Sequence, residues 1–295
     1  MARGTDVVAE PELVELGPED LPSVTALLGE RPAAESRWVG VKFAEQLVAA
    51  AGWLATDHGV RLLGPVIDTG MRDQAFEDAL IGAVEEIAAE EAALSQHPTT
   101  ADIPVIEANA RGPLTVDRLR SLGYRGEVPV LCRRLPDLLA VPTAEAMRAL
   151  GRHLAGLLRA GDLVIATGDL GAGKTTLTQG IGAGLGVDEP VTSPTFVLSR
   201  IHPGADGAPD LVHVDAYRLA DSDEVDDIDL DHDLDRSVTV IEWGAGLAEQ
   251  LVDHRLEIDI RRSENPADES RLVILRPVGE RWAGVRLVPL EGTEQ

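Results

Sequence analysis

The chain has 295 residues, of which 44% are hydrophobic, enough for two ordinary domains that each bury a core. Its formal net charge of −25 repels phosphate backbones and argues against direct, autonomous binding of nucleic acid. A single cysteine (Cys132), no signal-peptide pattern, and a longest mostly apolar run (near 44–55) too short for a membrane span lead us to expect a cytoplasmic protein without a membrane partner.

The first part of the chain, residues 1–136, is predicted to form an α+β domain. Proline and acidic residues near position 18 are typical of a helix start, and the apolar spacing of 72–94 is typical of a long helix. In chain order, we expect an extended stretch at 12–16, a helix within 17–28, an apolar periodic segment at 42–55, a strand at 60–68, a helix at 72–94, a helix near 114–122 and a strand at 127–133.

Residues 137–142 are predicted to be a linker, because prolines stand on both sides of the stretch. A second domain is expected at 143–283, with 284–295 as a C-terminal tail. Its predicted helices cover 144–159 and 175–185, and its later predicted strands cover 210–215, 237–243, 255–262 and 271–277. Strands that alternate with helices, and a Gly-rich turn after the first strand, indicate an α/β fold with a central, mostly parallel sheet.

The stretch GDLGAGKTT, residues 168–176, fits the phosphate-binding pattern G-x-x-x-x-G-K-[ST] and stands between an apolar strand and an apolar helix. Its glycines let backbone N–H groups turn inward, and the following helix adds the positive end of its dipole. Lys174 is expected to reach the β- and γ-phosphates of ATP, and the Thr175 hydroxyl to bind Mg²⁺. The predicted nucleotide-binding residues of this loop are Asp169, Gly171, Ala172, Gly173, Lys174, Thr175 and Thr176.

Two carboxylates follow buried apolar strands, Asp215 after LVHV and Glu242 after VTVI. Strand ends of this kind lie at the edge of the sheet where nucleotides bind. Either acid could bind Mg²⁺ directly or through water, and either could orient an attacking water. Trp243 follows directly, and both a functional role and ordinary core packing remain open for it.

Four segments in order, GDLGAGKTT, TSPTF (192–196), HVDAYRL (213–219) and IEW (241–243), closely resemble the TsaE family of bacterial ATPases. The resemblance covers about 141–262. It implies a P-loop NTPase fold that binds ATP and Mg²⁺ and hydrolyses ATP poorly alone. It also implies action with TsaD and TsaB, which form N6-threonylcarbamoyladenosine at position 37 of tRNAs reading codons that begin with A. Contact with tRNA would then be indirect, through the complex.

The same resemblance assigns roles to single residues. Glu242 resembles the family's second Mg²⁺ ligand beside Thr175, and Asp215 resembles its catalytic acid. Ser193, Pro194 and Thr195 resemble a switch-like segment near the γ-phosphate, with Thr195 at the nucleotide, and Trp243 matches a functional tryptophan. One departure is Asp229, which stands where relatives often have glycine. The acidic stretch 221–235 is predicted to be a solvated helical face, since it lacks the glycine and terminal glutamate of a calcium loop.

The N-terminal domain resembles the GNAT acetyltransferases in its order of elements and in its closing segment RLRSLGYRGEVPVLCRRL (118–135). In that family, a glycine-rich loop holds the pyrophosphate of coenzyme A. Here Ala75 and Glu77 replace the glycines, and Leu119 stands where a tyrosine general acid is often found. Because Glu77 places negative charge at the pyrophosphate position, we expect a degenerate fold without catalysis that serves docking or stability. An active acetyltransferase remains the alternative.

Two other functions are compatible with the phosphate loop. A small-molecule kinase would need an arginine-rich lid, yet the segment after Trp243 has no arginine before Arg255. A non-enzymatic, nucleotide-gated interaction module would differ only in whether hydrolysis matters. Arg218 is a candidate arginine finger within the chain, and a partner protein could supply one instead.

Overall fold

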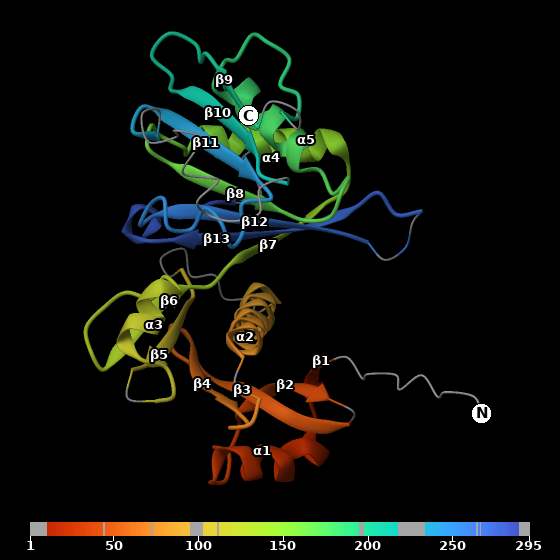
Figure 1. Cartoon of the computed structure of the whole chain (residues 1–295), viewed down its shortest axis with the longest axis vertical. Helices are drawn as coiled ribbons and strands as arrows, with labels where there is room; N and C mark the ends of the chain where they lie inside the picture. The colour runs from red at the N-terminus through yellow and green to blue at the C-terminus, as the bar shows by residue number, and fades with distance from the viewer. Residues whose placement is uncertain are drawn as a thin grey trace, which may run out of the picture. The chain divides into compact units, whose positions relative to one another are not determined.

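The computed structural model describes residues 11–43, 45–71, 73–94, 103–110, 112–194, 198–217, 234–263, 265 and 267–288. The chain divides into two compact units, Met1–Leu135 and Pro136–Gln295. Each unit has its own β-sheet, drawn in red to yellow and in green to blue in Figure 1. The fold is therefore mixed α/β with two sheets.

The N-terminal unit is built on a six-stranded sheet in the order β1-β2-β3-β4-β5-β6. Neighbouring strands are antiparallel except β4 and β5, which are parallel. The strands are β1 (Glu12–Leu16), β2 (Arg37–Phe43), β3 (Gln46–Thr56), β4 (Gly59–Ile67), β5 (Val105–Asn109) and β6 (Val130–Arg134). The helical elements are η1 (Pro18–Asp20), α1 (Leu21–Leu28), α2 (Gln74–Leu94) and α3 (Val116–Ser121).

Helices α1 and α2 cover opposite faces of this sheet (Figure 1). Val24 of α1 packs in one buried cluster with Trp38, and Trp53 lies on the α2 side, where its indole N–H donates to Glu91. Strands β4 and β5 pair through Gly59, Val60 and Arg61, while β4 continues to Ile67. The later half of β4 is thus free of this pairing and borders a groove at the start of α2.

The C-terminal unit has a seven-stranded sheet in the order β7-β13-β12-β8-β11-β10-β9. The central strands β12, β8, β11 and β10 run parallel, and the flanking pairs are antiparallel. The strands are β7 (Asp137–Val141), β8 (Leu163–Thr167), β9 (Ser199–His202), β10 (Asp210–Asp215), β11 (Ser237–Glu242), β12 (Arg255–Arg262) and β13 (Arg271–Val278). The parallel centre agrees with the α/β fold expected from the sequence.

Helices α4 (Ala144–Ala155) and α5 (Lys174–Gly184) pack on one face of this sheet (Figure 1). Their shared core includes Leu177 and Ile181 of α5 together with Val240 of β11. The other face is covered by the segment after β11, through side chains such as Ala248. Since apolar strands are buried on both faces, the parallel centre of the sheet can support polar groups at its carboxyl edge.

Two expectations about domain organisation need correction. The predicted linker 137–142 contains β7, which pairs with β13 from Asp137 to Val141 at the edge of the C-terminal sheet. The predicted tail from 284 begins too early, because Leu287 is fully buried and its carbonyl lies 3.0 Å from Nε2 of His153. The short 3-10 helix η2 (Glu280–Trp282) precedes this segment.

Most predicted elements appear within a few residues of their expected bounds. The helix expected at 144–159 ends at Ala155, and the apolar segment at 42–55 is mainly strand β3. Strands β2, β5 and β9 have no counterpart among the expectations. Several predicted features lie outside the described residues, namely Thr195, Arg218, Asp229 and the stretch 221–235 up to residue 233.

Candidate functional site

The phosphate-binding loop connects β8 to α5. Its turn requires glycine at two points, since Gly168 and Gly173 have φ values of 128° and 121°. A Cβ on Gly168 would also lie 2.2 Å from the carbonyl oxygen of Ile260 on β12. The loop is therefore held against the sheet, and its conformation is one that only glycine adopts without strain.

The N-terminus of α5 opens into a cavity of about 420 Å³. Gly173 is the N-cap residue and provides no side-chain cap, so the first-turn N–H groups have no intrahelical acceptor. Such a helix end attracts anions through its N–H groups and its dipole. The lining residues include Gly171, Gly173, Lys174, Thr175, Thr176, Ser193, Asp215, Tyr217, Glu242 and Trp243.

Lys174 folds back onto its own loop. Its ammonium Nζ donates to the carbonyl oxygens of Gly168 at 2.6 Å and Asp169 at 3.0 Å. The same nitrogen lies 3.7 Å from the ring centroid of Trp243, within the range of a cation–π interaction. Burial lowers the pKa of Lys174, and the nearby carboxylates of Glu242 and Asp215 only partly oppose this. This buried cation is well placed to meet an anionic ligand in the cavity.

Thr175 and Glu242 form the second pair in the cavity. The Thr175 hydroxyl Oγ1 lies 2.9 Å and 3.1 Å from the two carboxylate oxygens of Glu242. Oε1 of Glu242 also accepts from Nε2 of His213 at 2.8 Å. Glu242 is the last residue of β11 and is 3% exposed. Its buried carboxylate is held between the Thr175 hydroxyl and the His213 imidazole.

Asp215 ends β10 and stands in register with Glu242 on the neighbouring parallel strand. Its Oδ2 accepts from the Ser193 hydroxyl at 2.8 Å, and its Oδ1 accepts from the backbone N–H of Tyr217 at 3.1 Å. The register explains the convergence, because parallel strands bring their carboxyl ends to one edge of the sheet. Asp215 thereby links the cavity to the segment around Ser193.

Trp243 follows Glu242 with a φ of 64°, which is unusual for a bulky residue and indicates a strained backbone. Its ring faces Lys174 and lies 5.2 Å from the ring centroid of Tyr217, with the ring planes at 58°. Trp243 also packs against the cluster that covers the far face of the sheet. Trp243 thus lines the cavity and also packs against the core, and its functional role stays a prediction.

Two further residues predicted from the sequence, Asp169 and Ala172, shape the phosphate loop through their backbone groups. Asp169 contributes its carbonyl to Lys174 and its backbone to the loop, since the N–H of Ala172 donates to that same oxygen. Ala172 is buried, and its carbonyl accepts from Nε of Arg271. His213 was not predicted, although a histidine inside the apolar strand LVHVD was a visible signal.

Thr175 and Glu242 offer the hard oxygen donors that Mg²⁺ prefers. No group of three or more His, Cys, Asp or Glu side chains that could hold a metal occurs within the described ranges. Mg²⁺ usually binds through one or two protein oxygens, with phosphate oxygens and water as further ligands. The donor set therefore fits a cation that binds together with a nucleotide.

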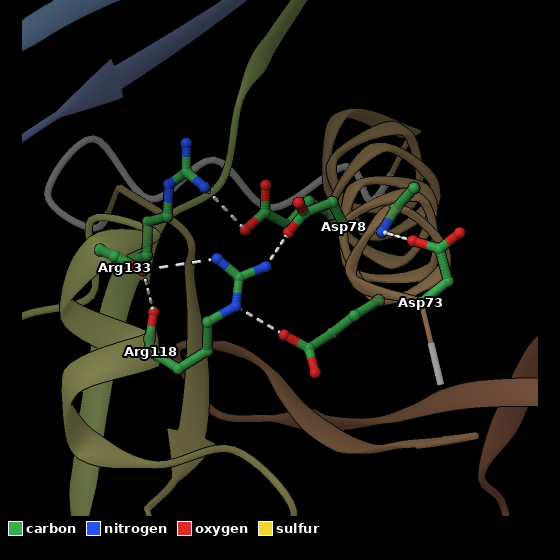
Figure 2. Close-up of polar contacts among 8 residues, drawn as sticks. Asp73, Asp78, Arg118 and Arg133 are labelled. Carbon is green, nitrogen blue, oxygen red and sulfur yellow. Dashed lines mark hydrogen bonds and ion pairs between the residues drawn. The ribbon is translucent and has the colours of Figure 1, made fainter. Parts of the chain in front are cut away.

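A second cavity, of about 450 Å³, lies in the N-terminal unit between the end of β4 and the first turns of α2 and α3. Arg118 of α3 is the positively charged side chain among the residues that line this cavity. Its Nε donates to Glu77 at 2.6 Å, and its guanidinium also pairs with Asp78 (Figure 2). The N–H of Ala75 at the start of α2 is bonded by the Asp73 carboxylate at 2.8 Å. The chain's own carboxylates thus pair with the arginine of this groove and with a backbone N–H donor at the start of α2.

Leu119, the residue expected in place of a general acid, is fully buried. A nearby buried network joins Glu85 to the Tyr124 hydroxyl and to Arg133, each at 3.3 Å (Figure 2 labels Arg133). Burial and the adjacent Glu85 carboxylate raise the pKa of Tyr124. These groups support the interior of the unit and do not line the cavity.

Comparison with known proteins identifies relatives of the second half of the chain. The family model "Threonylcarbamoyl adenosine biosynthesis protein TsaE" matches residues 141–272. The tRNA threonylcarbamoyladenosine biosynthesis protein TsaE of Streptomyces coelicolor is 56% identical over 148 residues, which is 50% of this chain and 100% of the relative.

This chain belongs to the TsaE family.

The TsaE match includes every residue that lines the C-terminal cavity. A solved structure of Bacillus YdiB is 31% identical and covers 50% of this chain and 89% of its own, with a TM-score of 0.42. For the N-terminal unit, which the TsaE match leaves out, a solved GNAT acetyltransferase of Staphylococcus aureus is 11% identical and covers 43% of this chain and 99% of its own, with a TM-score of 0.32. None of the helices in the described ranges is long and apolar enough to cross a membrane.

Proposed function

We propose that this TsaE-family chain is an ATP-binding, Mg²⁺-dependent ATPase subunit. It is required to form N6-threonylcarbamoyladenosine at position 37 of tRNAs reading codons that begin with A. It acts in the cytoplasm with TsaD-like and TsaB-like proteins and meets tRNA only through that assembly. The names of its relatives, which refer to tRNA threonylcarbamoyladenosine biosynthesis, support the pathway.

One observation carries the ATPase part of the proposal. Lys174, Thr175, Asp215 and Glu242 converge on one cavity at the uncapped N-terminus of α5. In the bound state Lys174 would leave its loop carbonyls for the β- and γ-phosphates. The α5 N–H groups and the glycines of the loop would hold the phosphate chain, with Asp169, Ala172 and Thr176 shaping or lining that cradle.

Thr175 and Glu242 would hold Mg²⁺, which neutralises charge that develops on the transferred phosphoryl group. Asp215 is the proposed catalytic acid or base, and its bond to Ser193 keeps one oxygen oriented. Ser193, Pro194 and Thr195 form the proposed switch segment, and Trp243 would cover the nucleotide-facing side of Lys174. Every one of these groups belongs to this chain, and we expect the rate of hydrolysis to depend on partners.

The kinase alternative receives less support. Among the described residues that line the cavity there is no arginine that could clamp a transferring phosphoryl group. Arg255 is nearly buried and pairs with Glu257 instead of lining the site. We therefore place phosphoryl transfer to water ahead of transfer to a small molecule.

The N-terminal unit is proposed to be a non-catalytic, acetyltransferase-like fold that serves docking or stability. Its groove is lined by Glu77 and Arg118, and Arg118 pairs with both Glu77 and Asp78 at the start of α2. An anionic cofactor there would have to displace ion pairs within the chain and meet carboxylates, which is electrostatically adverse. The arrangement gives no support to an active acetyltransferase.

The ATPase proposal is tested by reconstitution of the full chain with TsaD-like and TsaB-like proteins from the same organism. We expect slow ATP hydrolysis alone and faster hydrolysis in the assembly. Lys174→Ala should lower the assembled rate by on the order of 10²–10³-fold, as for loss of a main electrostatic contact. Glu280→Gln, an exposed acid of η2, is the matched control and should leave the rate unchanged.

The pathway proposal is tested in cells. Copies of the chain purified from the native cell should bring TsaD-like and TsaB-like proteins with them, and a deletion strain should lose the modified adenosine. Absence of those partners, with normal modification in the deletion strain, would overturn the proposal. A Glu242→Ala variant that binds ATP and restores full modification would instead favour the nucleotide-gated module without hydrolysis.

A further inference from the structure

His213 lies in the middle of β10, one pleat below the carboxyl edge of the sheet. It is fully buried between the valines of the LVHVD strand. Its Nε2 lies 2.8 Å from Oε1 of Glu242. The imidazole is therefore a direct neighbour of the carboxylate that lines the cavity, although His213 itself does not line it.

The sheet register explains how His213 reaches Glu242. His213 pairs with Val240 on β11, and Asp215 pairs with Glu242. Alternate residues of a strand point to the same face, so His213 and Glu242 lie on the α5 side of the sheet, at successive levels. The Thr175 hydroxyl approaches the same carboxylate from α5. Glu242 is thus fixed from the sheet by an imidazole and from the helix by a hydroxyl.

The imidazole is chemically out of place in an otherwise apolar strand. A carboxylate accepts hydrogen bonds, so Nε2 carries the proton in this contact. Nδ1 of His213 is buried and has no hydrogen-bond partner within the part of the chain that the structure describes. A leucine here would bury no unpaired nitrogen and would suit the strand better. The feature that a leucine could not supply is the N–H directed at Glu242.

We propose that His213 is a positioning residue that orients the Glu242 carboxylate toward Thr175 and the metal held there. The inference rests on the proposed Mg²⁺–ATP function and names the residue that makes Glu242 a preorganised ligand. Groups that hydrogen-bond a ligating side chain orient it, and their loss typically costs 10–100-fold in metal affinity or activity. Oε1 accepts from both His213 and Thr175, whereas the Thr175 hydroxyl is the one hydrogen-bond partner of Oε2 among the described residues. Oε2 is therefore the oxygen with more capacity left for a metal.

The neighbouring strand supplies a matched control. His202 on β9 pairs with Leu211, two residues before His213, and so lies on the same face of the sheet. It is also fully buried, and both of its ring nitrogens lack a hydrogen-bond partner within the described ranges. His202 therefore shares the environment of His213 and lacks its contact with Glu242.

The test compares His213→Leu, His213→Gln and His202→Leu in the full chain. Mn²⁺ binding to the protein–ADP complex is measured by electron paramagnetic resonance, and ADP binding without metal by calorimetry. His213→Leu should weaken Mn²⁺ binding by about 10–100-fold and leave metal-free ADP binding unchanged. His213→Gln should restore most of the affinity, because its amide N–H lies the same number of bonds from Cβ as the N–H of His. His202→Leu should match the wild type.

Two results would overturn the inference. One is equal Mn²⁺ affinity in His213→Leu and His202→Leu, which would make the Glu242 contact irrelevant to the metal. The other is a parallel loss of metal-free ADP binding and thermal stability in both His213 variants, which would assign His213 a purely structural role. Failure of the proposed function is distinguishable, since the wild type would then bind neither ADP nor Mn²⁺ with ADP.

Discussion

The two lysines of this chain, Lys42 and Lys174, stand in opposite electrostatic environments. Lys42 lies 2.9 Å from the Asp20 carboxylate, and this hydrogen bond raises its pKa. Lys174 has its ammonium on loop carbonyls and the Trp243 ring, and burial lowers its pKa. In an unfolded chain both side chains would titrate near 10.4. Folding therefore moves the pKa values of two lysines, which are alike in the unfolded chain, in opposite directions.

This separation can be measured directly. After reductive ¹³C-methylation, the full chain should give two lysine side-chain signals, assigned with Lys42→Arg. The Lys174 signal should lose its proton at lower pH than the Lys42 signal. Addition of ADP should move the Lys174 titration to higher pH, because phosphate charge favours the ammonium form. A Lys174 signal that titrates at or above Lys42 would contradict the buried, carbonyl-bound geometry.

At the residue scale, local motifs predicted much of the cavity. The glycines, Lys174 and Thr175 are placed by a contiguous pattern, and Asp215 and Glu242 follow from strand ends in a parallel sheet. His213 escaped prediction because its role depends on the register between β10 and β11. One histidine in a valine-rich strand looks the same whether it faces a carboxylate or only the core.

At the element scale, α4 and α5 approach so closely that their backbones touch. A Cβ on Gly151 of α4 would lie 2.4 Å from the carbonyl oxygen of Leu177, and one on Gly180 of α5 would lie 2.3 Å from that of Arg148. Backbone carbonyls cannot move aside as flexible side chains do. The glycines therefore set the distance between the helices and, through α5, the position of the phosphate loop against the sheet.

Gly180→Ala should destabilise the C-terminal unit. In a helix, alanine is more stable than glycine by about 1 kcal/mol. The clash of its Cβ with the Arg148 carbonyl should cost about 1–3 kcal/mol and so outweigh that gain. The expected result is a fall of several degrees in the unfolding temperature of the full chain, measured by calorimetry. The control is Gly82→Ala in α2, where a Cβ would meet nothing within 4 Å, so stability should rise slightly. Equal effects of both changes would refute the close contact.

Two of the elements that sequence patterns missed, β5 and β7, depend on partners that are distant in the chain. Strand β7 lies between two prolines, which suggested a linker, yet it is held by β13, far along the chain. Strand β5 is five residues long and is fixed by β4 and β6. Helices α2, α4 and α5 were predicted well because their periodicity is local. Short strands carry little local signal, and their conformation is fixed by pairing with neighbouring strands.

At the scale of the whole molecule, the chain joins a site with the features of a nucleotide pocket to a unit with a different kind of groove. In that groove the arginine is already paired with carboxylates of the same chain. Arg118 is held by Glu77 and Asp78, and Asp73 already bonds a backbone donor at the start of α2. The formal net charge of −25 adds a general repulsion toward polyanions. Both features disfavour the binding of free anionic ligands by the N-terminal unit.

Isothermal titration of the full chain with acetyl-CoA should give no binding in the micromolar range. The same protein should bind ADP, which serves as the positive control for its folded state. Arg118→Ala would leave the groove more acidic and should not create binding. Micromolar affinity of the wild type for acetyl-CoA would revive the active acetyltransferase and overturn the degenerate interpretation.

The position of β7 has a practical consequence for any separated TsaE-like half. A fragment that begins at residue 143 would discard β7 and leave the backbone N–H and C=O groups along one edge of β13 without their strand partner. Unpaired sheet edges recruit other chains, so this fragment should aggregate, whereas a fragment that begins at residue 136 should remain monodisperse in light scattering. The edge strand of the TsaE-like sheet thus begins directly after the N-terminal unit, so the residue at which the two units are cut apart should decide whether the TsaE-like fragment stays soluble.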